Sequence, residues 1–315
     1  MRVFITGIEG FVGRHLVMEL VKAGHEVSGL YFDKMDLDEI EALAERLYRG
    51  DLRDSVSLNQ ILDSARPDAI VHLAAISFVP AASSDPRTAW DINLGGTLNI
   101  LEWIRVAKPD THLLFVSTSE VYGRSDGGDL PFTEETPLRP ANMYSATKAS
   151  ADMAADQYRS LFSLRIATLR PANHIGPGQS ENFVVSSFAR QVAEAALGLG
   201  DGVIRVGNLS AMRDFLDVRD VVRAYRLVLE QQITGIFNLG SGKAERISDI
   251  LDSLVEIAGA RISVVVDKER LRPVDVPIIF ISREKLSAES GWTPEIPLIK
   301  TLEDTLKCWK DKLRK

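Results

Sequence analysis

The sequence predicts an α/β protein, a doubly wound parallel sheet with a smaller C-terminal lobe. Three observations lead to this fold class. Short β-rich runs alternate with amphipathic stretches of helical spacing, several runs are almost continuously apolar, and a glycine-rich turn joins the first run to the first amphipathic stretch. Such alternation gives right-handed βαβ units, and strands covered on both faces are apolar throughout. The length of 315 residues fits about two domains.

The first part of the chain contains the most regular units. In the first predicted helix Phe11, Leu16 and Leu20 share one face, and Gly24 provides a C-terminal stop. Residues 69–74 and 112–117 are apolar runs typical of buried parallel strands. In order, we expect strands at 2–6, 26–32, 69–74, 112–117 and 164–169, a short strand before Gly50, and helices at 11–23, 37–47, 55–65, 93–107 and 146–161.

After Pro171 the rhythm changes, because prolines and glycines cluster at residues 171–178 and the later units are less regular. We expect helices at 184–197, 218–231, 248–258 and 299–312, and strands at 203–206, 236–239 and 262–266. Residues 1–171 are therefore expected to form the sheet domain, with parts of 205–245 rejoining it. Residues 172–315 are expected to form mainly the smaller lobe.

Composition excludes several functional classes. The chain has 37 Lys and Arg against 44 Asp and Glu, a net charge of −7, whereas nucleic-acid binders show a basic surplus or stripe. The longest weakly polar stretch, residues 69–82, is shorter than the roughly 20 residues of a membrane span. Cys308 is the single cysteine, and the histidines lack metal-ligand spacing. We expect a cytoplasmic protein with no metal, no nucleic-acid partner and no membrane span.

Residues 6–13 read Thr-Gly-Ile-Glu-Gly-Phe-Val-Gly, directly between the first strand and the first helix. Gly7, Gly10 and Gly13 allow a tight turn, and the helix that begins with Phe11 and Val12 offers N–H groups to a pyrophosphate. The pattern predicts a Rossmann-type dinucleotide-binding domain with NAD or NADP as cofactor. A purely structural turn is the alternative.

The choice between the two cofactors depends on the end of the second strand, where a carboxylate ordinarily binds the adenosine ribose. Asp33 is the nearest carboxylate, although Tyr31 is an alternative occupant of that position, and Lys34 is the cation at hand for a 2′-phosphate. We expect NADH to be accepted at least as well as NADPH. Asp51 is a candidate for the adenine amino group, or else caps the next helix.

Tyr144 and Lys148 stand four residues apart and so share one helix face. A nearby ammonium lowers the pKa of a phenol from about 10 toward neutrality, and Tyr144 could then exchange a proton with a carbonyl or hydroxyl. Upstream, Ser117, Thr118 and Ser119 end a predicted strand at the sheet edge where ligands bind. Together with the glycine-rich turn, these residues predict an active site.

These motifs resemble those of the extended short-chain dehydrogenase/reductases over essentially the whole chain. The matches are residues 6–13, Asp-Leu-x-Asp at 51–54, His-Leu-Ala-Ala at 72–75, Asn93, Ser-Thr-Ser at 117–119, Tyr-x-x-x-Lys at 144–148 and Arg-Pro-x-Asn at 170–173. The resemblance implies that Tyr144 is the catalytic acid/base, that Lys148 binds the nicotinamide ribose and tunes Tyr144, and that Thr118 holds the reacting oxygen. It implies cofactor contacts from Gly7, Gly10, Phe11, Val12, Gly13, Asp33, Asp51, Leu52, Leu73, Ala74, Ala75, Tyr144 and Lys148.

Segments 173–180, 206–215 and 270–277 are similar to those of the GDP-4-keto-6-deoxy-D-mannose reductases. This implies a GDP-sugar substrate whose diphosphate lies against Arg213 and Arg272, since two arginines can clamp a pyrophosphate. Asn173 is implied to border the sugar phosphates. Further substrate contacts are expected from Ser77, Ser119, Glu120 and Asp275.

The expected reaction is the NAD(P)H-dependent reduction of the C4 keto group of GDP-4-keto-6-deoxy-D-mannose to GDP-D-rhamnose. Thr118-Ser119-Glu120 also fits the Thr-x-Glu motif of 4,6-dehydratases, in which the Glu moves the sugar C5 proton. A dehydratase, a 4-epimerase and a non-catalytic dinucleotide sensor therefore stand as alternatives, although a sensor does not need the Tyr144–Lys148 pair. The residues fix neither the C4 stereochemistry nor the nucleobase.

The predicted helices 93–107 and 146–161 carry more apolar and small residues than packing on one sheet needs. Enzymes of the resembled family commonly pair these helices with their copies about a two-fold axis. We expect a homodimer through these two helices. The alternative is that their alanines pack on the protein's own sheet.

Overall fold

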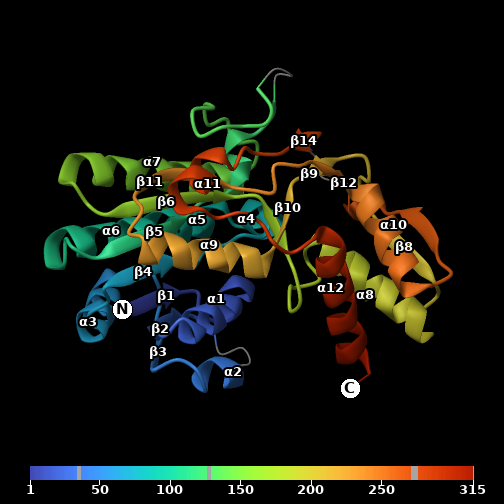
Figure 1. The fold of residues 1–315 in the computed structure, drawn as a ribbon, viewed down its shortest axis with the longest axis horizontal. Helices are drawn as coiled ribbons and strands as arrows, with labels where there is room; N and C mark the ends of the chain where they lie inside the picture. The colour runs from blue at the N-terminus through green and yellow to red at the C-terminus, as the bar shows by residue number, and fades with distance from the viewer. Residues whose placement is uncertain (34–36, 126–128, 271–275, 315) are drawn as a thin grey trace.

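The computed structural model describes residues 1–33, 37–125, 129–270 and 276–314, and a seven-stranded sheet lies at its centre (Figure 1). The strand order is β11-β6-β5-β4-β1-β2-β3, and all six pairs are parallel. The chain begins at β1 inside the sheet, adds β2 and β3 on one side, and then adds β4, β5, β6 and β11 on the other side. This is the doubly wound order that the sequence predicts. The strands are β1 (Arg2–Thr6), β2 (Glu26–Tyr31), β3 (Arg46–Arg49), β4 (Ala69–His72), β5 (His112–Val116), β6 (Ile166–Pro171) and β11 (Gly235–Leu239).

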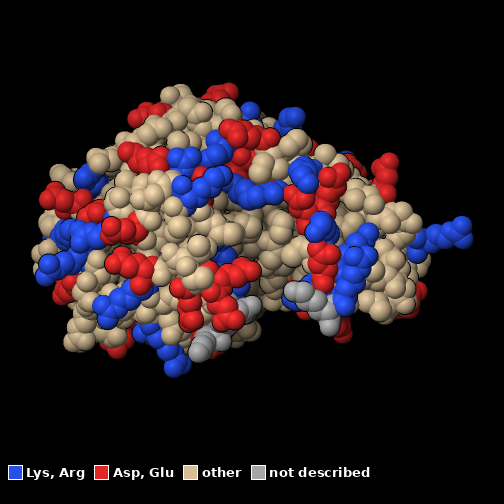
Figure 2. All heavy atoms as spheres, turned by 60° about the horizontal axis from the view of Figure 1, so that its bottom comes forward, with Lys and Arg blue, Asp and Glu red and all other residues tan. Residues whose placement is uncertain are grey.

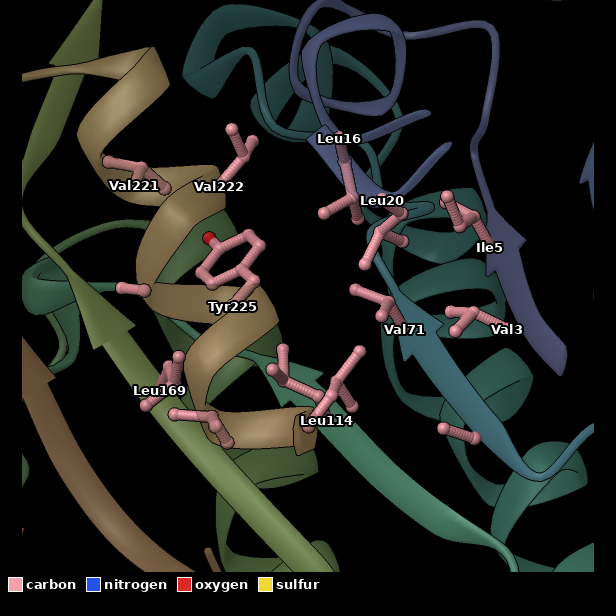
Figure 3. Close-up of a cluster of buried hydrophobic side chains, with 14 of the residues drawn as sticks. Val3, Ile5, Leu16, Leu20, Val71, Leu114, Leu169, Val221, Val222 and Tyr225 are labelled. Carbon is pink, nitrogen blue, oxygen red and sulfur yellow. The ribbon is translucent and has the colours of Figure 1, made fainter. Parts of the chain in front are cut away.

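Helices cover both faces of this sheet, because successive residues of each strand point to opposite faces. Ile5 of β1 belongs to one buried cluster with Leu20 and Tyr225 (Figure 3). Its neighbour Phe4 points to the other face and belongs to a second cluster with Ile100. The first face carries α1 (Phe11–Lys22), α9 (Val218–Glu230) and α11 (Glu284–Ser290), and the second carries α3 (Ser55–Ala65), α6 (Gly96–Ala107) and α7 (Met143–Phe162).

A separate buried core lies in the lobe at the right of Figure 1. Val192, Leu254 and Leu306 come from three helices that pack around it. The Trp309 indole N–H donates to the Ser186 hydroxyl at 2.9 Å and joins the last helix to the first of the three. The elements of this lobe are α8 (Val184–Leu197), β8 (Val203–Val206), α10 (Ile247–Ala258), β13 (Ser263–Val266), which pairs with β8, and α12 (Leu298–Leu313).

Short strands connect the main sheet to this lobe. One small sheet pairs β7 (Asn173–Ile175) with β10 (Phe215–Asp217), and another holds β9 (Met212–Arg213) between β12 (Glu245–Arg246) and β14 (Ile278–Ile279). Because β7 follows β6 almost directly, both small sheets lie beside the carboxyl edge of the main sheet. The remaining short helices are α2 (Asp38–Glu41), α4 (Val79–Ser84), α5 (Pro86–Trp90), η1 (Asp91–Gly95), η2 (Ser119–Tyr122) and η3 (Lys268–Arg270).

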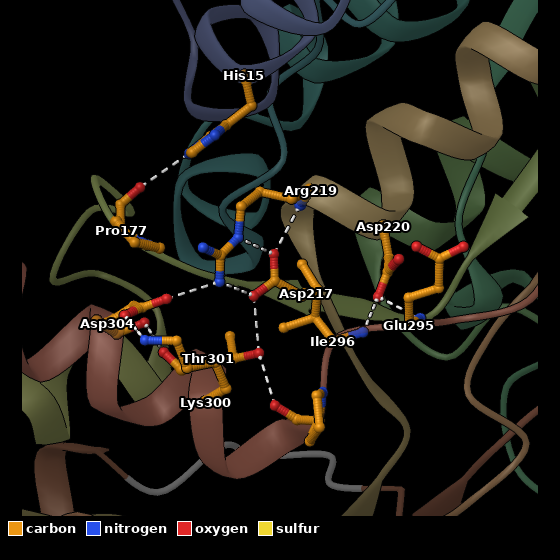
Figure 4. A network of polar contacts seen from close by, with 12 residues as sticks. His15, Pro177, Asp217, Arg219, Asp220, Glu295, Ile296, Lys300, Thr301 and Asp304 are labelled. Atoms are coloured by element: carbon orange, nitrogen blue, oxygen red, sulfur yellow. Dashed lines mark hydrogen bonds and ion pairs between the residues drawn. The ribbon is translucent and has the colours of Figure 1, made fainter.

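Polar contacts fasten α12 to the start of α9 (Figure 4). The buried carboxylate of Asp217 caps α9, accepts from the Arg219 guanidinium at 2.8 and 2.7 Å, and accepts from the Thr301 hydroxyl at 2.7 Å. Arg219 also pairs with Asp304 of α12 at 2.9 Å. We call these four residues, together with Asp220 and its partners, the α9–α12 junction.

Between the main sheet and the smaller lobe, the face drawn in Figure 2 is hollowed. Acidic and basic side chains are interspersed around the hollow on this face. This mixture agrees with a chain whose net charge is only −7.

The predicted helix at 37–47 is wrong over most of its length. The structure has a single short turn, α2, and then β3, which pairs in parallel with β2. The Glu45 amide donates to the Val27 carbonyl at 2.7 Å and starts this pairing. Helical spacing of Leu37, Ile40 and Leu47 suggested a helix, but the open edge of β2 favours a strand, so tertiary pairing overrides the local pattern.

Several other boundaries agree or shift by a few residues. Segments 2–6, 55–65, 184–197 and 203–206 have the predicted bounds, and β11 rejoins the sheet as expected. The helix α7 begins at Met143 rather than at residue 146, because Asn142 and Ser145 form a capping box there. The predicted helix 93–107 starts as the π-helical turn η1 before it continues as α6.

Candidate active site

The glycine-rich turn is tied to the ends of two neighbouring strands. The amides of Gly7 and Ile8 donate to the Leu30 carbonyl of β2 at 2.9 and 3.3 Å. Gly7 has a φ of +71°, and a Cβ there would lie 2.9 Å from the Ala74 Cα, just beyond β4. A Cβ at Gly13 would lie 2.4 Å from the Ile8 carbonyl oxygen. Both positions therefore require glycine.

This turn opens α1 in a form that fits a pyrophosphate. Gly10 is the N-cap of α1 and supplies no side-chain cap. Because the first N–H groups of a helix have no acceptor within the helix, those of this turn are suited to bind a pyrophosphate. The Ala74 amide donates to the Thr6 hydroxyl at 3.3 Å, which holds the segment after β4 against the turn. The structure thus brings together, along the carboxyl edges of β1 and β4, the predicted cofactor residues Gly7, Gly10, Phe11, Val12, Gly13, Leu73, Ala74 and Ala75.

The predicted carboxylates at the adenosine end are arranged differently from expectation. Asp33 is exposed and lies beyond the end of β2, and Lys34 lies outside the described residues. Asp51 accepts from the amide and side chain of Arg53 at 2.9 and 3.0 Å, which lowers the pKa of Asp51. Asp54, and not Asp51, caps α3, while Leu52 is buried and packs closely against the backbone of α6 at Gly96.

Glu9, a residue that the sequence analysis did not single out, reaches the end of β2 from inside the turn. Its Oε1 accepts from the Phe32 amide at 2.9 Å. Its Oε2 is shielded from solvent and has no hydrogen-bond partner among the described residues. The available signal was an acidic residue within the glycine motif itself.

Tyr144, Thr118 and Lys148 come together at the carboxyl edge of β5. The Thr118 hydroxyl accepts from the Glu120 amide at 3.2 Å and hydrogen-bonds Tyr144. Lys148, one turn further along α7, is buried with its Nζ 4.4 Å from the Phe115 ring centroid. The capping box fixes where α7 begins, and therefore where its first turn presents Tyr144.

The electrostatics of this pair differ from the sequence prediction. Burial, followed by the charge of Glu120, raises the pKa of Tyr144 above its usual range, and the hydrogen bond with Thr118 only partly opposes this. Burial lowers the pKa of Lys148 to about 7, against the opposing charge of Asp152. The expected lowering of the Tyr144 pKa by Lys148 is therefore wrong, because burial and the charge of Glu120 dominate and Lys148 is not among the groups that shift this pKa.

Glu120 lies close enough to Tyr144 for its charge to raise the pKa of that phenol. Its Oε2 accepts from the Asn142 side-chain amide at 2.9 Å, so the residue that caps α7 also orients this carboxylate. Ser119 is buried in the η2 turn that carries Glu120. Among the predicted substrate residues that the structure describes, Glu120 is the one whose charge raises the pKa of Tyr144.

The other predicted substrate residues lie in two places. Asn173 and Arg213 are half-buried on the adjoining small sheets, where the Asn173 amide donates to the Asp214 carbonyl at 3.1 Å. One Arg213 N–H donates to the Met212 carbonyl at 2.8 Å. Ser77 is exposed after β4. Arg272 and Asp275 lie outside the described residues.

The histidines have structural partners. His72 bonds Thr6 at 2.7 Å and Thr97 at 3.0 Å, and burial lowers its pKa to about 3, which confirms a packed, hydrogen-bonded histidine. His174 is stacked on Phe11 with ring centroids 6.3 Å apart. His15 bonds the Pro177 carbonyl at 3.0 Å (Figure 4). These contacts hold the glycine-rich turn against the segment after β6.

Asn93 joins the segment after β4 to α7, the helix that carries Tyr144 and Lys148. Its side-chain oxygen accepts from the Ile76 amide at 2.8 Å, and its side-chain amide donates to the Thr147 hydroxyl at 2.9 Å. It lies in η1, and such π-helical turns recur at functional sites. The residue therefore positions α7 relative to the loop that carries Leu73 to Ser77.

A family described as GDP-mannose 4,6 dehydratase matches residues 4–305. The chain belongs to this family. GDP-6-deoxy-D-mannose reductase of Pseudomonas aeruginosa is 35% identical over 99% of this chain and 98% of its own length. UDP-glucose 4-epimerase of Corynebacterium glutamicum is 31% identical over 96% of this chain and 93% of its own length.

Two solved structures of nucleotide-sugar enzymes are similar to this protein over almost its whole length. The structure of RMD from Pseudomonas aeruginosa complexed with NADPH has a TM-score of 0.87 and 33% identity, and 99% of each chain is covered. UDP-glucose 4-epimerase of Thermus thermophilus with NAD has a TM-score of 0.87 and 30% identity, with 98% and 99% covered. The chain is thus an NAD(P)-dependent oxidoreductase of the extended short-chain type.

Among the helices that the structure describes, none is both long and apolar enough to cross a membrane. Over the described residues, no three His, Cys, Asp or Glu side chains are grouped so that they could hold a metal ion.

Proposed function

We propose that this enzyme reduces the C4 keto group of GDP-4-keto-6-deoxy-D-mannose and produces GDP-D-rhamnose. The observation that carries the proposal is the convergence of Tyr144, Thr118 and Lys148 on the same sheet edge as the glycine-rich turn, in a chain similar to a GDP-6-deoxy-D-mannose reductase. The cofactor is NAD or NADP in its reduced form.

A reductase needs Tyr144 in its protonated state. A tyrosine with the ordinary pKa of about 10 already holds its proton at neutral pH, and burial and Glu120 raise the pKa of Tyr144 further, so the phenol is in the state that donates a proton to the C4 oxygen. Thr118, hydrogen-bonded to Tyr144, holds and polarises the same oxygen. A reduced nicotinamide held at this site would supply a hydride to C4, and with the proton from Tyr144 the carbonyl would become an alcohol. Lys148 binds the nicotinamide ribose and keeps Tyr144 in place.

The substrate is proposed to lie between the two lobes. Asn173 and Arg213, on the small sheets beside the carboxyl edge, would face the sugar and diphosphate, together with Arg272 and Asp275. Ser77, Ser119 and Glu120 would border the sugar from the sheet side. In this proposal residues 1–171, with parts of 205–245, are the dinucleotide-binding domain, and 172–315 are mainly the substrate-binding lobe.

We also propose a cytoplasmic homodimer formed through α6 and α7. Val106, Met153 and Leu161 on these helices are 69, 54 and 71% exposed, and large apolar side chains grouped in this way favour a partner. Ala151 and Ala155 pack in the protein's own core, so the large residues and not the alanines define the face. Light scattering should give about twice 34.8 kDa, and a monomer mass would contradict the dimer.

A 4,6-dehydratase is the second candidate, because the Glu120 carboxylate lies beside Tyr144 and is oriented by Asn142. A dehydratase keeps its cofactor through a closed oxidation and reduction cycle, whereas a reductase consumes the reduced form. The test is NMR of the product from GDP-4-keto-6-deoxy-D-mannose with NADH or NADPH. We expect GDP-D-rhamnose with one cofactor oxidised per sugar. Conversion of GDP-mannose to a 4-keto sugar without added cofactor would overturn the reductase in favour of the dehydratase.

A further inference from the structure

We propose that Glu9, and not Asp33, sets the preference of this enzyme for NADH over NADPH. The inference rests on the proposed function, because it concerns the adenosine end of the same cofactor site. Glu9 lies inside the glycine-rich turn, one residue before the N-cap of α1. Its carboxylate reaches across to the end of β2, which is where a dinucleotide's adenosine ribose meets this type of fold.

The bonding of the Glu9 carboxylate leaves one oxygen for a ligand. Oε1 accepts from the Phe32 amide at 2.9 Å and fixes the direction of the side chain. Oε2 is shielded from solvent and has no hydrogen-bond partner among the described residues. A buried carboxylate oxygen without a donor is unfavourable, so a ligand hydroxyl that supplies a hydrogen bond is favoured there. The 2′-hydroxyl of NADH can supply that bond.

A 2′-phosphate has the opposite interaction with this carboxylate. It brings about two negative charges and only acceptor oxygens, so it repels Glu9 and cannot satisfy Oε2. The repulsion is weakly screened because Oε2 is withdrawn from water. Asp33 lacks these features, since it is exposed and lies beyond the end of β2.

Two of the described cations near this end are already engaged. Arg53 forms an ion pair with Asp51, with both Nε–O distances at 3.0 Å. The Arg14 Nε donates to the Glu9 carbonyl at 3.1 Å, and so its guanidinium lies on the same turn. Arg49 lies opposite Tyr31 at the end of β3, so Arg14 and Arg49 are described cations that would oppose Glu9 if a 2′-phosphate were bound.

The test measures cofactor binding without turnover. The Kd values of NADH and NADPH are obtained from nicotinamide fluorescence for the parent enzyme, Glu9→Gln and Asp33→Asn, each checked for folding by circular dichroism. Glu9→Gln keeps the shape and the acceptor toward Phe32 but removes the charge. Asp33→Asn is the matched control, because it removes a carboxylate from the same region. Binding of 5′-AMP and of 2′,5′-ADP repeats the comparison on the adenosine end alone.

We expect the parent to bind NADPH at least about tenfold more weakly than NADH, equivalent to roughly 1.4 kcal/mol. Glu9→Gln should strengthen NADPH binding about tenfold and change NADH binding less than threefold, while Asp33→Asn leaves both within threefold. Equal or tighter NADPH binding by the parent, an unchanged NADPH Kd in Glu9→Gln, or a gain in Asp33→Asn would overturn the role of Glu9. Failure of a folded parent to bind either cofactor would overturn the proposed function as well.

Discussion

The carboxyl edge of the main sheet and the α9–α12 junction both hold buried polar and charged side chains, but their hydrogen bonds are completed to different degrees. At the junction, Asp220 accepts from Arg223 at 2.7 Å and from the amides of Glu295 and Ile296 at 3.0 and 2.8 Å (Figure 4). At the sheet edge, Ser117 Oγ and Glu9 Oε2 have no partner among the described residues.

The difference separates a structural cluster from a binding cluster. The junction is saturated with bonds, so its polar groups hold the smaller lobe in place. The sheet edge leaves donors and acceptors open and shifts the pKa values of Tyr144 and Lys148 by burial, features that gather at functional sites. Substitutions at the edge should therefore change catalysis, whereas substitutions at the junction should change stability.

The largest effect is expected from Tyr144→Phe, which keeps the ring and removes the proton donor. General acid catalysis is worth about 10²–10⁴-fold, so kcat should fall by at least that factor. The Kd of the cofactor and the melting temperature should stay close to those of the parent. Turnover near the parental rate would show that the proton comes from another group.

At the junction, Asp220→Ala should lower the free energy of unfolding by about 3 kcal/mol, because it leaves Arg223 and two backbone amides without their acceptor. The kcat per folded molecule should not change. Urea unfolding measures the first quantity and steady-state kinetics the second. Asp304→Ala, which breaks a more exposed pair, is the control and should cost less than about 1 kcal/mol. A large loss of kcat in folded Asp220→Ala would contradict the assignment of the junction to stability and of the sheet edge to catalysis.

Lys148→Met tests how much the buried ammonium at the sheet edge destabilises the fold, and how this cost depends on pH. The folded pKa of about 7 is below the ordinary value of 10.5, so the unfolded chain holds this proton more tightly. The charged lysine therefore destabilises the fold most below about pH 7, and this cost disappears as the pH rises toward the unfolded value. Lys148→Met should be more stable than the parent by up to about 5 kcal/mol near pH 7, and this difference in the free energy of unfolding should narrow by pH 10. Urea unfolding from pH 7 to pH 10 measures this difference in the free energy of unfolding. A difference that does not depend on pH would contradict the lowered pKa of Lys148. Lys307→Met, on the surface of α12, is the control.

The smallest effect is expected from Glu120→Gln, because a reductase has no C5 proton for this carboxylate to move. The amide preserves the size of the side chain beside Asn142. We expect kcat for the 4-keto sugar to change less than about threefold, with a modest fall in the pKa of Tyr144 as one of the charges that raises it is removed. The pH–rate profile measures both. Loss of nearly all activity would instead favour the dehydratase.

The sequence predicts the sheet edge well and the junction hardly at all. Strand, glycine-rich turn and helix are contiguous at residues 2–22, and local periodicity is enough to place them. Tyr144 and Lys148 share a helix face whatever surrounds them. The junction instead joins residues 217–223 to residues 293–304, and no local pattern connects segments so far apart.

The sequence predictions that failed concern burial and pairing. The direction of the Tyr144 pKa depends on how completely the site excludes water, which spacing alone does not reveal. Asp33 stays a prediction from its spacing after the glycines, and that spacing could not reveal that Glu9 also reaches the end of β2 from within the turn. The strand β3 forms because β2 offers a free edge, although its residues are spaced as a helix.

The strand β11 has a consequence for the biosynthesis of the chain. It pairs with β6 at the edge of the main sheet, yet the chain makes α8, β8 and α9 before it reaches Gly235. During translation, all six residues of β6 are therefore present long before the partner that covers their outer edge. An apolar strand with an open edge recruits other strands. Nascent chains that end before Gly235 therefore carry this open edge, and a cut between Pro171 and Gly235 would separate β11 from the sheet that it completes.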